Sequence, residues 1–132
     1  MGTFETRVTV SNIVEERSET VASLVDTGAS DSVFPGELLG YLGVQRGTLP
    51  PVEYITADGT AVYCERGSAT LEIEVEPETW VKGIVPVAFW PDDSNYCIGA
   101  TTLQILMLGV DPPNERLIRI TQGRHGWSGA LR

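Results

Sequence analysis

The sequence predicts an all-β domain with two short helices. Apolar and polar residues alternate with period two along most of the chain, which is typical of half-buried strands. An Asp58-Gly59 pair lies between two such runs, a strong signal for a β-hairpin. With 132 residues, the chain is one domain by length and can bury roughly two thirds of its unfolded surface. We therefore expect a sheet that closes in the manner of a barrel.

The first elements follow from local patterns near the N-terminus. Residues 4–10 alternate and predict a half-buried strand, and the polar residues 12–19 predict a turn. Residues 21–25 are mostly apolar, as in a strand covered on both faces. Pro35 is suited to the first turn of a short helix, which Gly43 is expected to end.

Strands dominate the middle of the chain. Residues 52–57 and 60–65 are expected to pair across the Asp-Gly turn. Residues 69–76 alternate, which predicts a strand with one wet face. Residues 81–89 predict another strand, in which Pro86 indicates an edge or a bulge.

The remaining elements are short. Residues 96–98 predict a buried strand, and residues 101–107 predict a second helix closed by Gly109. Residues 116–120 predict a last strand. Two partners stay open for it, the N-terminal strand or its mate in a second copy of the chain.

The domain is expected to cover residues 1–120, followed by a polar, flexible tail at residues 121–132. His125 lies in this tail, so we do not expect it to act as a catalytic base. Together with Cys64 and Cys97 it cannot supply the four ligands of a zinc site. We therefore expect no metal and no other cofactor.

The charge narrows the range of partners. The net charge is −9, from 18 acidic and 9 basic residues. Such a surface repels phosphate backbones, so we expect no nucleic acid and favour a cationic or neutral polypeptide. No run of about 18 apolar residues predicts a membrane span. No signal peptide is recognisable, so we expect a cytoplasmic protein with reduced, buried thiols.

A carboxylate ends the second predicted strand. Asp26 follows the apolar run and directly precedes Thr27-Gly28, a turn-forming pair. This position brings an acidic side chain to the rim of a buried sheet. There it is either a solvated turn residue or part of a reactive site.

Two segments of the chain are similar to each other. Residues 26–30 and 97–101 both end in Gly-Ala-hydroxyl, and each is followed by a helix and Leu-Gly-Val, at 42–44 and 108–110. This similarity predicts a duplicated unit with approximate two-fold symmetry. Only the first copy carries a carboxylate, Asp26. Chemistry that needs two would take the second from another chain, as a C2 dimer allows.

These residues resemble the active-site signature of aspartic proteases. Residues 24–30 read Leu-Val-Asp-Thr-Gly-Ala-Ser, and the single copy in a short chain is similar to the retropepsin-like members of prokaryotic, single-domain type, which are homodimers. Residues 56–59, Thr-Ala-Asp-Gly, resemble the flap turn of these relatives. So do Ile-Gly-Ala-Thr-Thr-Leu at 98–103 and Leu-Gly-Val-Asp-Pro at 108–112.

The resemblance implies a closed, barrel-like acid-protease (retropepsin) fold, a flap hairpin over a cleft, and aspartic endopeptidase activity. Asp26 would be the catalytic carboxylate, Thr27 would hydrogen-bond across the dimer axis, and Gly28 would let the substrate backbone approach. The two Asp26 carboxylates would share a proton and activate a water that hydrolyses an extended polypeptide. Substrate contacts are expected from Ala29, Ser30, Asp31, Ala57, Asp58 and Gly59.

The chain departs from retroviral members at two positions. Those proteins usually carry Asp where this chain has Ser30 and Arg where it has Ala100, and the two side chains commonly pair. Both residues are uncharged here, so neither leaves a buried charge without a partner. Asp31 lies next to this position, and it either lines the cleft or is a solvated turn residue.

Two other functions stay open. A non-catalytic peptide-binding dimer of the same fold would hold an extended peptide without cutting it. A structural β domain would use Asp26 only as a turn residue and the hairpin at residues 52–65 only as core. Cleaved peptides and self-association would separate these hypotheses from a protease.

Overall fold

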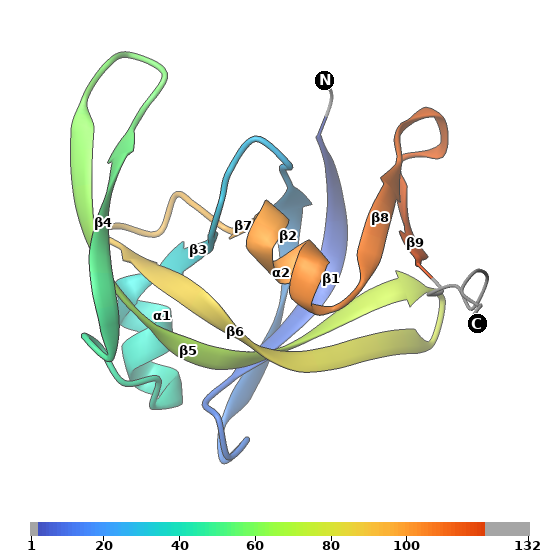
Figure 1. Ribbon diagram of the computed structural model, residues 1–132. Helices are drawn as coiled ribbons and strands as arrows, with labels where there is room; N and C mark the ends of the chain where they lie inside the picture. Colours follow the sequence, from blue (N-terminus) through green and yellow to red (C-terminus); the bar gives the residue numbers. More distant parts are fainter. Residues whose placement is uncertain (1–2, 121–132) are drawn as a thin grey trace, which may run out of the picture.

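The computed structural model describes residues 3–120, which form strands and a few short helical segments (Figure 1). The strands are β1 (Phe4–Ser11), β2 (Ser18–Val25), β3 (Ser32–Pro35), β4 (Leu49–Ile55), β5 (Ala61–Glu76), β6 (Thr79–Trp90), β7 (Cys97–Ile98), β8 (Leu108–Asp111) and β9 (Arg116–Arg119). The helices are α1 (Gly36–Leu42), α2 (Ala100–Ile105) and the 3-10 turn η1 (Pro112–Asn114). The predicted all-β class is confirmed.

Seven of the strands form one sheet, in the order β1-β2-β7-β3-β6-β5-β4. β1 also pairs with β5, so the order closes on itself. β8 and β9 form a separate antiparallel pair, seen at the right of Figure 1. The connection between β2 and β3 and the free end of the β4–β5 hairpin lie at the same end of the molecule (Figure 1).

The interior contains two apolar clusters of different size. The larger one fills the space between the closed strands, α1 and α2. The smaller one lies under the β4–β5 hairpin and joins it to β3, β6 and β7. Its buried members are Val33, Cys64, Ala88 and Cys97, and Ala29, Val52, Tyr54, Val62 and Trp90 pack against them in part.

Local signals predicted several elements correctly. β1 follows the alternating residues 4–10, and its register with β2 places Val8 opposite Val21. α1 begins directly after Pro35 and ends at Gly43, whose φ of 87° is the left-handed conformation that glycine adopts without strain. The Asp-Gly hairpin is present as β4 and β5. The edge or bulge expected at Pro86 is not found, because β6 lies between β3 and β5; Pro86 pairs with Ser68 of β5 and lies just outside the stretch paired with β3.

Other predictions need correction. The second strand is not covered on both faces, because Leu24 is 43% exposed while Val25 is buried. β3 was not predicted at all. Residues 60–65 and 69–76 do not form two strands but belong to the continuous strand β5 of 16 residues. Arg66 and Gly67 continue the ladder between them, paired with β6.

The C-terminal elements also differ from expectation. α2 ends at Ile105, earlier than expected, and Met107 takes the left-handed conformation with φ 57°. Gly109, expected to close the helix, lies inside β8. The last strand pairs with β8 of its own chain and not with the N-terminal strand, and pairing with its mate in a second copy stays a prediction. The predicted tail, with His125, lies outside the described residues.

Candidate active site

Asp26 follows the last residue of β2, and its main chain and side chain are both fixed. Its N–H donates to the carbonyl of Ile98 at 3.0 Å, which extends the parallel pairing of β2 with β7. Its carboxylate oxygen Oδ1 accepts the N–H of Gly28 at 2.9 Å. A Cβ atom on Gly28 would lie 3.2 Å from the same oxygen, so a side chain there would crowd the carboxylate. The residue is therefore held at the rim of the sheet, as predicted.

The loop that carries Asp26 interlocks with the loop after β7. The N–H of Ala100 donates to the carbonyl of Ala29 at 2.8 Å, and the N–H of Thr101 donates to the carbonyl of Ser30 at 2.9 Å. Gly99 makes this close approach possible, because a Cβ there would lie 2.8 Å from the Ser30 carbonyl oxygen and closer still to that of Asp31. The two loops support each other through main-chain contacts.

The internal repeat is only partly a structural one. The strands that precede the two Gly-Ala turns lie side by side and parallel, with Leu24 opposite Cys97. The Leu-Gly-Val segments are not equivalent, however. Gly43 ends α1 in the left-handed conformation, whereas Gly109 is a strand residue paired with Ile118.

Both cysteines are buried and free, as the sequence predicted. Burial raises the pKa of the Cys97 thiol to about 11, and the negative charge of Asp26 adds to this rise. Burial also raises the pKa of Cys64. Cys97 corresponds to Asp26 in the repeat, and it is a neutral thiol at neutral pH. The described part of one chain therefore brings a single carboxylate to this place.

Asp31 is not the solvated turn residue that one hypothesis assumed. It is 6% exposed, and its carboxylate oxygen Oδ2 lies 3.2 Å from the Arg66 guanidinium. The Tyr54 hydroxyl donates to the same oxygen at 3.4 Å. Burial and the negative charge of Asp31 raise the pKa of Tyr54 well above its ordinary value. A buried carboxylate–guanidinium pair therefore exists here. It is formed by Asp31 and Arg66 and not by residues 30 and 100, which are uncharged.

The contacts of Arg66 and Tyr54 with Asp31 were not predicted. The contact between Arg66 and Asp31 joins residues 35 positions apart, and no spacing pattern in the chain signals it. Asp31 itself was the one available signal for such a contact. A carboxylate that is buried needs a partner, and Asp31 lies next to an apolar strand.

The β4–β5 hairpin has two distinct faces. Val52 pairs with Cys64 and Tyr54 pairs with Val62, and these four side chains face the smaller apolar cluster. The opposite face is open to solvent, where Tyr63 is 70% exposed.

The tip of the hairpin is a compact turn. The N–H of Thr60 and the hydroxyl of Thr56 both donate to the carboxylate of Asp58, and these bonds lower its pKa. Gly59 has a φ of 87°. Ala57, Asp58 and Gly59 are all exposed.

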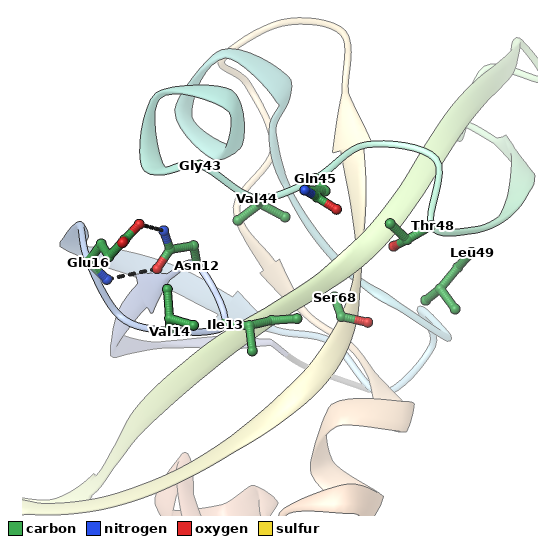
Figure 2. A pocket seen from close by; sticks show the side chains of 10 residues that line it. All are labelled: Asn12, Ile13, Val14, Glu16, Gly43, Val44, Gln45, Thr48, Leu49 and Ser68. Carbon is green, nitrogen blue, oxygen red and sulfur yellow. Dashed lines mark hydrogen bonds between the residues drawn. The ribbon is translucent and has the colours of Figure 1, made fainter.

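A surface pocket lies away from Asp26. This pocket of about 540 Å³ lies between the β1–β2 turn, the end of α1 and the base of β4 (Figure 2). There the N–H of Glu16 donates to the Asn12 side chain at 2.8 Å, and Ile13 and Leu49 line the hollow. No residue of the Asp26 loop lines it. Within residues 3–120, no group of three or more His, Cys, Asp or Glu side chains is placed to hold a metal ion.

An all-β fold with an Asp-Thr-Gly loop at the rim of its sheet is characteristic of the acid proteases. The aspartyl protease family model matches residues 7–111 of the chain. This chain belongs to the aspartyl protease family.

Among solved structures, 17 chains match. One of them, the EIAV protease complexed with the inhibitor HBY-793, is 23% identical, with a TM-score of 0.44. The match covers 80% of this chain and 88% of that chain. A comparison with curated proteins found no match. No helix within residues 3–120 has the length and apolar character needed to cross a membrane.

Proposed function

We propose that the protein is an aspartic endopeptidase that acts as a homodimer, with Asp26 of each subunit as the catalytic carboxylate. One observation carries this proposal. Asp26 is fixed by main-chain bonds at the rim of the sheet, while the second half of the repeat offers only the neutral thiol of Cys97. A site with two carboxylates therefore needs a second copy of the chain, and a C2 axis beside this loop would supply it.

In such a dimer the two Asp26 carboxyl groups lie about 3 Å apart and cannot both ionise cheaply. The ionised group accepts a proton from a water held between them, and the water oxygen attacks the peptide carbonyl. The protonated group donates a hydrogen bond to the developing oxyanion. The peptide C–N bond then breaks as the nitrogen takes up a proton. No group of the protein becomes covalently attached to the substrate.

The neighbouring residues have supporting roles in this proposal. Thr27 hydrogen-bonds across the axis and braces the two loops. Gly28 leaves room for the substrate backbone. Ala29 and Ser30 line the floor of the cleft, and Asp31 closes its end.

The β4–β5 hairpin acts as the flap. An extended substrate adds as a strand beneath it, with main-chain bonds to the tip formed by Ala57, Asp58 and Gly59. The apolar inner face of the hairpin, which includes Tyr54 and Val62, supports this role because it can cover substrate side chains.

The central test replaces the carboxylate. Asp26→Asn is expected to abolish cleavage of an unstructured polypeptide and to leave the circular dichroism spectrum unchanged, because the amide cannot act as the base. Asp93→Asn, in the exposed loop after β6, is the matched control and is expected to retain full activity. Cleavage by pure Asp26→Asn would contradict the proposal.

A mixing experiment tests whether the site is shared. When wild-type and Asp26→Asn chains are mixed equally and allowed to exchange, only dimers with two wild-type chains are active. The activity divided by the total concentration of chains falls to about a quarter of the wild-type value, whereas independent subunits would retain about half of it. Peptide binding without any cut product at any pH would instead favour the non-catalytic dimer.

A further inference from the structure

Arg66 connects the base of the β4–β5 hairpin to the Asp26 loop. Its Nη1 lies 3.2 Å and 3.4 Å from the two carboxylate oxygens of Asp31, and its Nε donates to the carbonyl of Pro50 at 2.6 Å. The side chains of Arg66 and Asp31 are only 19% and 8% exposed. The planar guanidinium suits this task, because its fixed donors reach two acceptors at once.

These contacts lie where the β4–β5 ladder is interrupted. The register shifts between Leu49 and Val52, and Pro50 and Pro51 occupy the interval. Neither proline has an N–H to donate, and a bulge of this kind bends the strand. β4 is also the last strand in the sheet order, so only β5 holds it along its length. The hairpin beyond the bulge is thus joined to the sheet through a pivot, and Arg66 lies at that pivot.

Both ends of the ion pair are anchored in the body of the protein. The carbonyl of Arg66 accepts the N–H of Gly47 at 2.9 Å. The carbonyl of Asp31 lies against Gly99, in the interlocked loops. The contact on the hairpin side is weaker, because the Tyr54 hydroxyl is uncharged and makes a single bond to Asp31, at 3.4 Å. Tyr54 also meets the edge of Trp90, with ring centroids 6.1 Å apart.

We propose that Arg66 and Asp31 are positioning residues that set the closed position of the flap, and that the Tyr54 hydroxyl on Asp31 is the contact that breaks when the flap opens. The inference rests on the proposed function, in which the hairpin covers substrate. The Arg66–Asp31 pair stays intact during opening and serves as the fixed point. The Asp31 carboxylate thereby takes part both in closing the flap and in placing the Asp26 loop.

Cys64 provides a reporter for this motion. Its side chain is on the inner face of the hairpin and is 1% exposed, so alkylation requires the hairpin to lift. Tyr54→Phe is expected to raise the alkylation rate of Cys64 about fivefold, the factor that corresponds to one ordinary hydrogen bond. Arg66→Lys keeps the charge but loses the forked geometry, and it is expected to raise the rate further. Mass spectrometry of the labelled peptide measures both rates.

Glu65→Gln is the matched control. It breaks the exposed ion pair between Glu65 and Arg46 at the neighbouring position of β5, and the labelling rate is expected to stay within twofold of wild type. Wild-type labelling rates in both Tyr54→Phe and Arg66→Lys would overturn the proposal. Thermal unfolding identifies an Arg66→Lys chain that fails to fold, in which case Tyr54→Phe decides alone.

Peptide cleavage supplies a second measurement. Tyr54→Phe is expected to raise KM about fivefold with kcat changed less than twofold, because a flap that opens more readily weakens substrate binding. A fall in kcat at constant KM would contradict a positioning role. The labelling assay needs no cleavage, so failure of the protease proposal and failure of this inference give different results.

Discussion

At the scale of single residues, Gly99 is a position where the structure leaves no room for a side chain. A Cβ there would collide with the carbonyls of Ser30 and Asp31, which belong to the rigid Asp26 loop. Gly99→Ala is expected to lower the free energy of unfolding by roughly 1–3 kcal/mol, as overpacking does.

Gly40→Ala is the control. Nothing lies within 4 Å of a Cβ at this exposed helix position, so it is expected to stabilise by roughly 0.5–1 kcal/mol. Urea unfolding distinguishes the two, and equal effects would contradict the predicted steric clash.

Cys97 gives a prediction about pH. Its ordinary pKa of 9.0 is raised to about 11 in the folded protein by burial and by Asp26. Between these values the unfolded chain ionises the thiol while the folded chain keeps the proton, so stability falls as pH rises from 9 to 11. The slope from this residue is at most about 1.4 kcal/mol per pH unit. Unfolding of wild type and Cys97→Ala at several alkaline pH values measures it, and parallel curves would contradict the burial effect.

The site shows which residues can be recognised from sequence and which cannot. Asp26, Thr27 and Gly28 are recognisable because they are adjacent, and a strand followed by a turn fixes where they lie. Arg66 is not, because its role depends on a long-range contact with Asp31 that only the closed sheet creates.

At the scale of elements, a buried hydroxyl pair joins β3 to α2. The oxygens of Ser32 and Thr102 lie 2.5 Å apart, and Ser32 also accepts the N–H of Gly99. Thr102→Val removes one hydroxyl at nearly constant shape and is expected to cost about 1–3 kcal/mol, because the buried Ser32 hydroxyl keeps the N–H of Gly99 but loses its other partner.

The β1–β2 ladder contains the matched control for that change. The hydroxyl oxygens of Thr9 and Thr20 lie 2.7 Å apart in an exposed pair, where water can replace a lost partner. Thr9→Val is therefore expected to change the free energy of unfolding by less than about 0.5 kcal/mol. Thermal unfolding measures the change in Tm of both variants, and equal changes would contradict the argument.

Elements with local signals were predictable, and elements that depend on distant partners were not. α1 carries its own start and stop residues, and the β4–β5 turn carries its Asp-Gly pair. β3 has only four residues, and it exists because β6 and β7 pair with it from far along the chain. β8 was also not predicted, although its partner β9 follows it closely along the chain.

At the scale of the whole molecule, charge opposes the proposed dimer. Each chain carries −9, so two copies repel each other through their summed fields. Raising the salt concentration from about 10 mM to about 150 mM shortens the screening length from roughly 30 Å to 8 Å and is expected to strengthen dimerisation at neutral pH. Sedimentation equilibrium measures the dissociation constant at both concentrations. A dimer that weakens with salt would show instead that attraction between charges holds it together.

The position of β7 has a consequence for synthesis on the ribosome. This strand lies between β2 and β3, yet it is encoded some 70 residues after them. A nascent polypeptide that has not yet emerged as far as β7 has no acceptor for the Asp26 N–H and lacks the main-chain bonds from residues 100 and 101 to the loop. The proposed cutting centre therefore forms only after β7 has left the ribosome, and shorter nascent chains cannot assemble it.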